Sequence, residues 1–137
     1  MNIAAKTLFI GALAIVLSAL VPGIDAAWSA EPVAGRWAGT VTEKSKKGDF
    51  VYTVYVKIAG DGASGSVQFL HYPCGGSLTL ASKAGGKYLY NEALNFGEKL
   101  CLNNLQARIA AVGADEILFE ELVNGAANVS GKLRKLH

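Results

Sequence analysis

The sequence predicts an all-β protein: a single eight-stranded, antiparallel, up-and-down β-barrel that follows an N-terminal signal peptide. Short segments rich in β-branched and aromatic residues succeed one another almost without interruption from residue 36 to residue 135. Turn residues separate these segments at intervals of about 10–14 residues, and such short connections favour antiparallel neighbours. Apolar and polar residues alternate within the segments, which gives each strand the one apolar face that a closed barrel needs.

The expected strands follow in chain order, and most are bounded by a clear turn signal. They are RWAGTVTE (36–43), FVYTVYVKI (50–58), GSVQFLHY (65–72), GSLTLAS (76–82), KYLYNEAL (87–94), LQARIAAV (105–112), EILFEEL (116–122) and ANVSGKLRK (127–135). Strands in simple succession can close on themselves and leave no unpaired edge, so a barrel is favoured over a sandwich. The segment 105–112 is ambiguous, because Leu105, Ile109 and Val112 also fit a helical stripe, and a helix there would make the fold α+β.

The first 27 residues have the features of a signal peptide. Lys6 precedes an apolar stretch from Thr7 to Val21, and Pro22 and Gly23 then break it. Small residues follow, and we expect cleavage between residues 26 and 30. The alternative is an uncleaved N-terminal anchor. Cleavage would leave a barrel domain at residues 31–137, without a membrane anchor, in the periplasm or outside the cell.

The charge of the chain excludes some classes of partner. The formal net charge is +2, which is too small to indicate nucleic-acid binding or attraction to an acidic membrane surface. The densest basic stretch, EKSKKGD at residues 43–49, ends in Gly-Asp and is expected to form a hairpin turn.

Cys74 and Cys101 are the only cysteines, and three interpretations compete for Cys74. A nucleophile would need His71 within hydrogen-bonding reach, but in an extended strand the two side chains point to opposite faces. A metal site would need three or four ligands at a recognisable spacing, which the chain does not offer. A disulfide between Cys74 and Cys101 needs only an oxidising compartment and a barrel end at which the two connections meet. The disulfide is therefore the preferred interpretation.

Side chains in the apolar phase of the strands are expected inside the barrel. The interior candidates are Trp37, Tyr52, Phe69, Tyr88, Tyr90, Glu92, Phe119 and Glu121. The aromatic residues among them, together with Phe50, Tyr55 and Tyr72, could line a ligand cavity, or aromatic side chains could fill the barrel completely. Glu92 and Glu121 could form an acid/base pair of the glycosidase kind. The alternative is that both lie near the barrel rim in ordinary polar contacts, with Arg108 or a tyrosine hydroxyl as partner.

The connections next to the two cysteines are the preferred location for a binding surface, because loops held on a rigid scaffold often carry binding residues. The candidates at this end are His71, Tyr72, Pro73, Asn95, Phe96, Lys99 and Asn103.

Two resemblances accompany this interpretation. The segment GRWAGT resembles the G-x-W that opens the first strand of the calycins (lipocalins and avidins), which implies that Trp37 packs at the closed barrel end beneath a basic residue of the last strand, here Arg134. The chain from Trp37 to Leu133 also resembles a small domain of exported bacterial proteins that has no established activity. The matching positions are W-x-G-T at 37–40, G-S-V at 65–67, Y-P-C-x-G-x-L-x-L at 72–80, Glu92, Cys101 and G-x-L at 131–133.

The expected function is binding without catalysis, because the sequence assembles no set of nucleophile, base and metal ligands, and no cofactor motif. The first hypothesis is an exported protein that binds a protein or a glycan through its disulfide-tied loops, for example as an inhibitor of a cell-wall or proteolytic enzyme. The analogy is with two exported inhibitor families of similar barrel size, which inhibit lysozymes and metalloproteases. The second hypothesis is a carrier of a small apolar ligand in the barrel interior.

Overall fold

The structure is a computed structural model that describes residues 29–137. The expected signal peptide, with its cleavage site between residues 26 and 30, therefore lies outside these residues. Residues 29–137 contain no helix that is long and apolar enough to cross a membrane.

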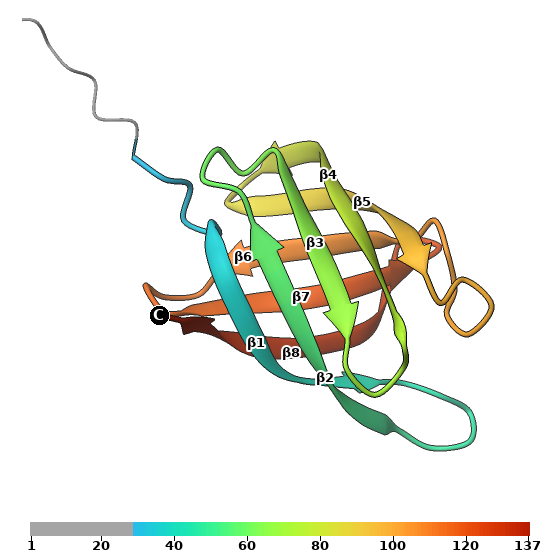
Figure 1. The fold of residues 1–137 in the computed structure, drawn as a ribbon. Coiled ribbons are helices and arrows are strands. Elements are labelled where there is room, and N and C mark those ends of the chain that lie inside the picture. Colours follow the sequence, from blue (N-terminus) through green and yellow to red (C-terminus); the bar gives the residue numbers. More distant parts are fainter. Residues whose placement is uncertain (1–28) are drawn as a thin grey trace, which may run out of the picture.

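The described residues form a closed, eight-stranded antiparallel barrel in which each strand pairs with the next, and β8 pairs with β1 (Figure 1). The predicted fold class is confirmed. The strands are β1 (Gly35–Glu43), β2 (Phe50–Ile58), β3 (Ser64–Phe69), β4 (Cys74–Ala84), β5 (Lys87–Phe96), β6 (Gln106–Ala111), β7 (Glu116–Val123) and β8 (Ala126–Leu136).

The ambiguous sixth segment is a strand, and the helical alternative is wrong. Ala107 pairs with Tyr90 of β5 on one side and with Glu121 of β7 on the other. A strand in this position satisfies the hydrogen-bonding groups of both neighbours, so tertiary pairing overrides the helix propensity of the alanines.

Side chains on the apolar face of each strand fill the barrel interior, as expected. In β2, Tyr52, Val54, Val56 and Ile58 are buried, whereas Tyr55 lies in the opposite phase and is only half-buried. All eight interior candidates are buried: Trp37, Tyr52, Phe69, Tyr88, Tyr90, Glu92, Phe119 and Glu121. The interior position of these residues follows from the two-residue period of a strand.

The barrel has two different ends. One carries the β2–β3, β4–β5 and β6–β7 connections together with the start of β1, and we call it the closed end. The other carries the β1–β2, β3–β4, β5–β6 and β7–β8 connections, and we call it the disulfide end. In Figure 1 the β1–β2 hairpin and the β5–β6 connection both extend from the disulfide end.

Trp37 is fully buried at the closed end. Its indole N–H donates a hydrogen bond of 2.8 Å to the Val33 carbonyl, which ties the segment before β1 to the core. The ammonium nitrogen of Lys135 lies 5.3 Å from the centre of the Trp37 ring. The basic residue above the tryptophan is thus Lys135 and not Arg134, which is exposed: residues 133 and 135 share a face of β8, and residue 134 is on the other.

Glu31 holds the same segment across the closed end. Its carboxylate accepts hydrogen bonds from the Tyr88 hydroxyl and, at 2.8 Å, from the Lys83 ammonium group. Its backbone N–H donates to the Gly60 carbonyl at 2.9 Å. These partners lie on the β2–β3 connection, β4 and β5, so the segment covers this barrel end.

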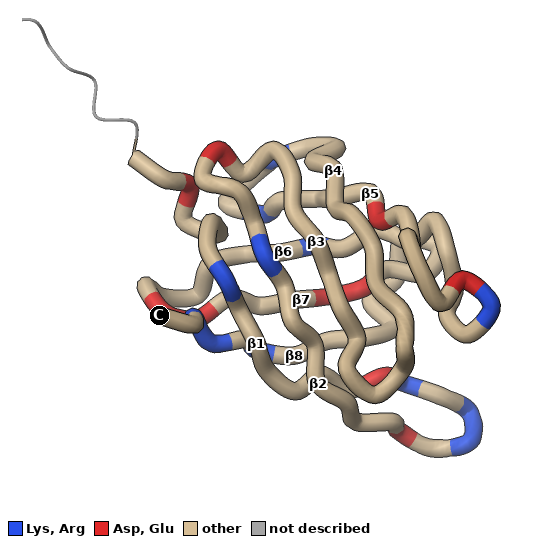
Figure 2. Tube along the Cα trace, viewed as in Figure 1, with Lys and Arg blue, Asp and Glu red and all other residues tan. Residues whose placement is uncertain are grey.

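Charged residues are spread over several strands and connections (Figure 2). The basic stretch at residues 44–49 forms the β1–β2 connection, as expected for a hairpin turn, and Lys44 and Asp49 pair across it at 2.7 Å.

Candidate functional site

A disulfide joins Cys74 to Cys101, and the predicted pairing is confirmed. Cys74 is the first residue of β4, and Cys101 lies in the β5–β6 connection, 27 residues further along the chain. Because both sulfur atoms are bonded, neither cysteine is available as a nucleophile or as a thiolate ligand.

The β5–β6 connection packs tightly against the start of β4. Gly97 has a positive φ of 71°, and a Cβ atom at this position would overlap the Pro73 carbonyl oxygen and lie 2.6 Å from the Cys74 Cβ. Only glycine allows this close approach. The Asn103 side-chain oxygen accepts a hydrogen bond of 2.9 Å from the Leu94 N–H and fastens the other side of the connection to β5. The connection is therefore fixed at three points.

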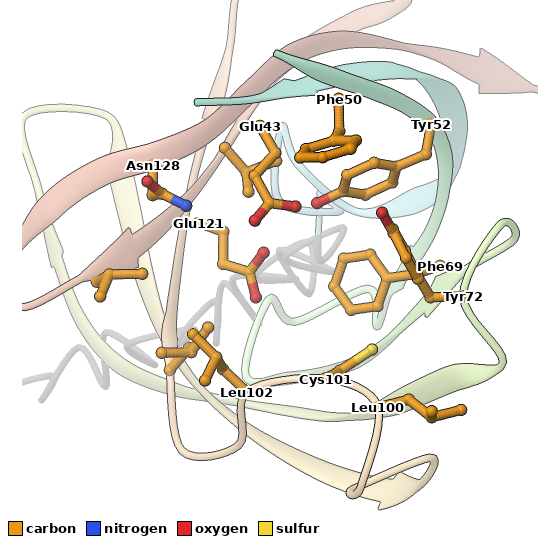
Figure 3. Close-up of a pocket in the computed structure, with 13 residues that line it drawn as sticks. Glu43, Phe50, Tyr52, Phe69, Tyr72, Leu100, Cys101, Leu102, Glu121 and Asn128 are labelled. Atoms are coloured by element: carbon orange, nitrogen blue, oxygen red, sulfur yellow. The ribbon is translucent and has the colours of Figure 1, made fainter. Parts of the chain in front are cut away.

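A cavity of about 250 Å³ lies beneath this connection at the disulfide end (Figure 3). Strands β1, β2, β3, β7 and β8 and the β3–β4 and β5–β6 connections supply its walls. The lining residues are Glu43, Phe50, Tyr52, Phe69, Tyr72, Leu100, Cys101, Leu102, Leu105, Glu121, Val123, Asn128 and Val129.

Only some of the residues that were predicted to lie inside the barrel line the cavity. Tyr52, Phe69 and Glu121 line it. The others are buried in the core without lining it: Trp37, Tyr88, Tyr90, Glu92 and Phe119. Aromatic residues of the barrel thus both contribute to its packed core and line the cavity near the disulfide end.

Of the predicted loop candidates, only Tyr72 lines the cavity. His71, Pro73, Asn95, Phe96, Lys99 and Asn103 are exposed and lie outside it. Asn95, Phe96 and Lys99 border a second, more open hollow on the outside of the β5–β6 connection. The disulfide end therefore presents both an inward cavity and an outward loop surface.

Several lining residues were not predicted from the sequence. Glu43 had a usable signal, because it shares the strand phase of the buried Trp37 and Val41. Leu100 and Leu102 had none, because they belong to a connection without any periodic pattern. The remaining missed residues are Leu105, Val123, Asn128 and Val129, whereas Phe50 lines the cavity as expected.

Glu121 is the most buried acidic group of the cavity, with 7% of the residue exposed. Burial raises the pKa of its carboxyl group from 4.5 to about 8, and the charges of Glu92 and Glu43 contribute to the same shift. Glu43 and Glu121 direct their carboxyl groups into the same space, and the Tyr52 hydroxyl faces Glu43 (Figure 3). Burial, followed by the charge of Glu121, also raises the pKa of Tyr52, so this hydroxyl keeps its proton.

Glu92 is sealed inside the barrel and does not line the cavity. It is 2% exposed, and neither of its carboxyl oxygens has a hydrogen-bond partner among the described residues. Burial raises its pKa from 4.5 to about 7. The expected position at the barrel rim is wrong for Glu92, which lies in the middle of β5.

Of the two expected partners of these glutamates, Arg108 or a tyrosine hydroxyl, the first is wrong. Arg108 Nε donates to Glu120 Oε2 at 2.6 Å on the outer face of β6 and β7, and so does not reach either buried carboxyl group. Because only Glu121 borders the cavity, the two carboxyl groups do not flank a common open space, as a glycosidase pair would. No group of three or more potential metal ligands gathers within residues 29–137.

The fold and the site together define a small, disulfide-bonded, eight-stranded antiparallel β-barrel with a cavity at one end. Comparisons with protein-family models, curated proteins and solved structures found no match for this chain. The cavity and the loops around it are therefore the features from which a function can be inferred.

Proposed function

We propose that this protein is a non-catalytic binding protein whose ligand is a small molecule with an apolar body, held in the cavity at the disulfide end. The observation that carries this proposal is the cavity itself, which lies at one end of the barrel next to its buried hydrophobic core. Ligand sites are typically concave and mostly apolar, with a few polar groups that fix orientation.

The surroundings of the cavity support the proposal. Leu100 and Leu102, which line the cavity from the connection fixed by the disulfide, are 63% and 64% exposed. Phe50 and Tyr72 are also partly exposed and belong to the same lining. Apolar side chains left exposed around a hollow gain from contact with an apolar molecule, because that contact removes them from water.

The volume indicates the size of the part of a ligand that the cavity can hold. An apolar cavity of roughly 150 Å³ holds one benzene molecule. The cavity of about 250 Å³ therefore suits a molecule with one aromatic ring and a short substituent.

A titration with 2-phenylethanol, followed by NMR, tests this proposal. We expect the amide signals of Tyr52, Phe69 and Glu121 to shift, because these residues line the cavity. The variant Val123→Trp places a large side chain in the cavity wall and should abolish the shifts. The matched control is Val51→Trp, which changes an exposed residue outside the lining. Shifts confined to other parts of the barrel, or retained in full by Val123→Trp, would contradict the proposal.

A second candidate function is binding of a protein through the same barrel end, including inhibition of a cell-wall or proteolytic enzyme. The observation in its favour is that Val51, Leu70 and Phe96 are exposed at this end but do not line the cavity. Native mass spectrometry of protein isolated from its own cells separates the two candidates. A retained small molecule supports the first, and a stoichiometric protein partner that is lost in Leu70→Asp supports the second.

We also propose that the protein is exported to the periplasm or secreted. The apolar N-terminal stretch and the disulfide both support this location, since disulfides persist in oxidising compartments. Cell fractionation and the intact mass of the isolated protein test it. We expect a chain that begins between residues 27 and 31; a reduced, full-length chain in the cytoplasm would contradict export.

A further inference from the structure

Glu121 is a polar group without a protein partner in the wall of the cavity. More than nine-tenths of the residue is buried, and it lines the cavity. Figure 3 shows its carboxyl group directed into the open space rather than into the barrel wall. No residue of the described chain donates a hydrogen bond to it. Its oxygens border the open cavity, so the hydrogen-bond donors that they lack must come from solvent or from a ligand.

The other polar groups of the cavity share its negative character. Glu43 directs a second carboxyl group into the same space, and the Tyr52 hydroxyl and the Asn128 side chain border it (Figure 3). Glu92 adds a third carboxyl group close enough for its charge to act on Glu121. The thirteen lining residues include no lysine, arginine or histidine. An anionic ligand would face carboxyl groups without any compensating positive charge.

Aromatic rings form one wall of the same space. The Tyr52 ring packs edge-on against Phe69, with ring centres 6.0 Å apart, and against Tyr72, with ring centres 5.3 Å apart. Aromatic faces attract cations and also pack against apolar groups.

We propose that the ligand of this cavity is a small organic cation: a protonated amine whose ammonium group binds between Glu43 and Glu121, and whose apolar body packs against Tyr52, Phe69 and Tyr72. This inference rests on the proposed function of the cavity and adds the sign of the ligand's charge. An ammonium group supplies hydrogen-bond donors to Glu121, which receives none from the described residues, and further donors to Glu43, which otherwise faces only the Tyr52 hydroxyl. Charge-assisted hydrogen bonds of this kind are the strong ones.

Proton release on binding is the signature of this mode. In the empty cavity the raised pKa of Glu121 keeps its carboxyl group largely protonated near neutral pH. The groups that face it are Glu43 on β1, Tyr52 on β2, Tyr72 on the β3–β4 connection and Glu92 on β5, and none of them is cationic. A bound ammonium ion favours the carboxylate and lowers this pKa, so binding at pH 7 expels a proton.

Three probes of closely similar size separate the possibilities: phenethylamine, a cation; 2-phenylethanol, which is neutral; and phenylacetate, an anion. Calorimetric titrations at pH 7 in two buffers of different ionisation enthalpy measure both affinity and proton release. We expect phenethylamine to bind about tenfold more tightly than 2-phenylethanol or better, from hydrogen bonds to charged groups, and to release a proton. Phenylacetate should bind more weakly than either.

The variant Glu121→Gln keeps the shape of the side chain and removes its charge, and we expect it to lose the preference for phenethylamine and the proton release. The matched control is Glu120→Gln on the outer face of the same strand, which should retain both. Glu43→Gln, at the end of β1 nearer the rim, is a second test variant in case Glu121→Gln folds poorly. It should also weaken the binding of phenethylamine.

The outcomes distinguish the two proposals. Equal binding of phenethylamine and 2-phenylethanol, or an unchanged preference in both glutamine variants, would overturn the cation while leaving the cavity as a ligand site. Failure of all three probes to bind would contradict the proposed function itself.

Discussion

Glu92 and Glu121 project into the same barrel interior from β5 and β7, with only β6 between them. Both are buried among apolar residues, and burial raises the pKa of Glu92 to about 7 and that of Glu121 to about 8. An unfolded chain exposes both groups to water, where their pKa values return to about 4.5. The folded protein therefore binds protons that the unfolded chain releases.

This linkage predicts a stability that falls as the pH rises. The stabilising effect of the two protons is fully present below pH 4.5 and is lost between pH 4.5 and about 8, as the pH passes the folded-state pKa values. Each carboxyl group contributes a slope of up to about 1.4 kcal/mol per pH unit inside its own window. Urea unfolding at intervals from pH 4.5 to 8.5 measures the effect.

Two glutamine variants serve as controls for this prediction. Glu92→Gln should flatten the pH dependence up to about pH 7, and Glu121→Gln should do so up to about pH 8. The lowered pKa of Glu31 acts in the opposite direction, but only below pH 4.5. A stability that increased between pH 5 and pH 8 would contradict the buried protonated state.

Loss of the disulfide should affect both stability and ligand binding. Replacing both cysteines by alanine removes a link across 27 residues, and we expect the free energy of unfolding to fall by about 3–4 kcal/mol in the chain-entropy model. Because Cys101 holds Leu100 and Leu102 over the cavity, binding of 2-phenylethanol should also weaken. Dithiothreitol should lower the stability of the native protein in the same way and should not change that of the double variant. If the native protein and the double variant were equally stable without reductant, the disulfide would not contribute to stability.

Trp37 is expected to be a major contributor to stability at the closed end. Trp37→Phe removes the hydrogen bond to the Val33 carbonyl and leaves a small void, so we expect a loss of about 2–4 kcal/mol. Lys135→Met, which keeps the length of the side chain, should cost about 0.5–1 kcal/mol through the lost cation–π contact. Arg134→Met changes an exposed neighbour and should leave the urea midpoint unchanged. A larger loss of stability in Arg134→Met than in Lys135→Met would show that Arg134, and not Lys135, is the basic partner of Trp37.

Gly76 allows the close contact between β4 and β5. A Cβ atom there would overlap the Ala93 carbonyl group and lie 2.8 Å from the Leu94 Cα, so backbone would have to move. We expect Gly76→Ala to destabilise the barrel by about 1–3 kcal/mol, as overpacking does. The control Gly60→Ala adds the same atom where nothing lies within 4 Å and φ is not positive, and it should be neutral or slightly stabilising in thermal unfolding. Similar melting temperatures for the two variants would show that β4 and β5 separate easily.

The strand pattern was sufficient to predict the barrel and its interior residues, because side chains alternate strictly between the two faces of a strand. The same rule identifies Lys135 as the partner of Trp37, since it shares the phase of Leu133; Arg134, the residue inferred from the calycin resemblance, has the wrong phase. The pairing of Cys74 with Cys101 also followed from the sequence, because successive antiparallel strands bring alternate connections to one end.

Alternation and turn signals in the sequence were thus enough to predict the order of the strands, their inner faces and the disulfide, but they left the segment 105–112 open between strand and helix. The tertiary structure alone decided which inward residues fill the core and which border open space, and it separated the sealed Glu92 from the cavity-facing Glu121. The physical reason is that strand alternation is a local, periodic property, whereas a cavity is the volume left over after side chains from many strands have packed. Leu100 and Leu102 reach that volume through a connection without periodicity, whose path is set by the disulfide and by its close packing at Gly97.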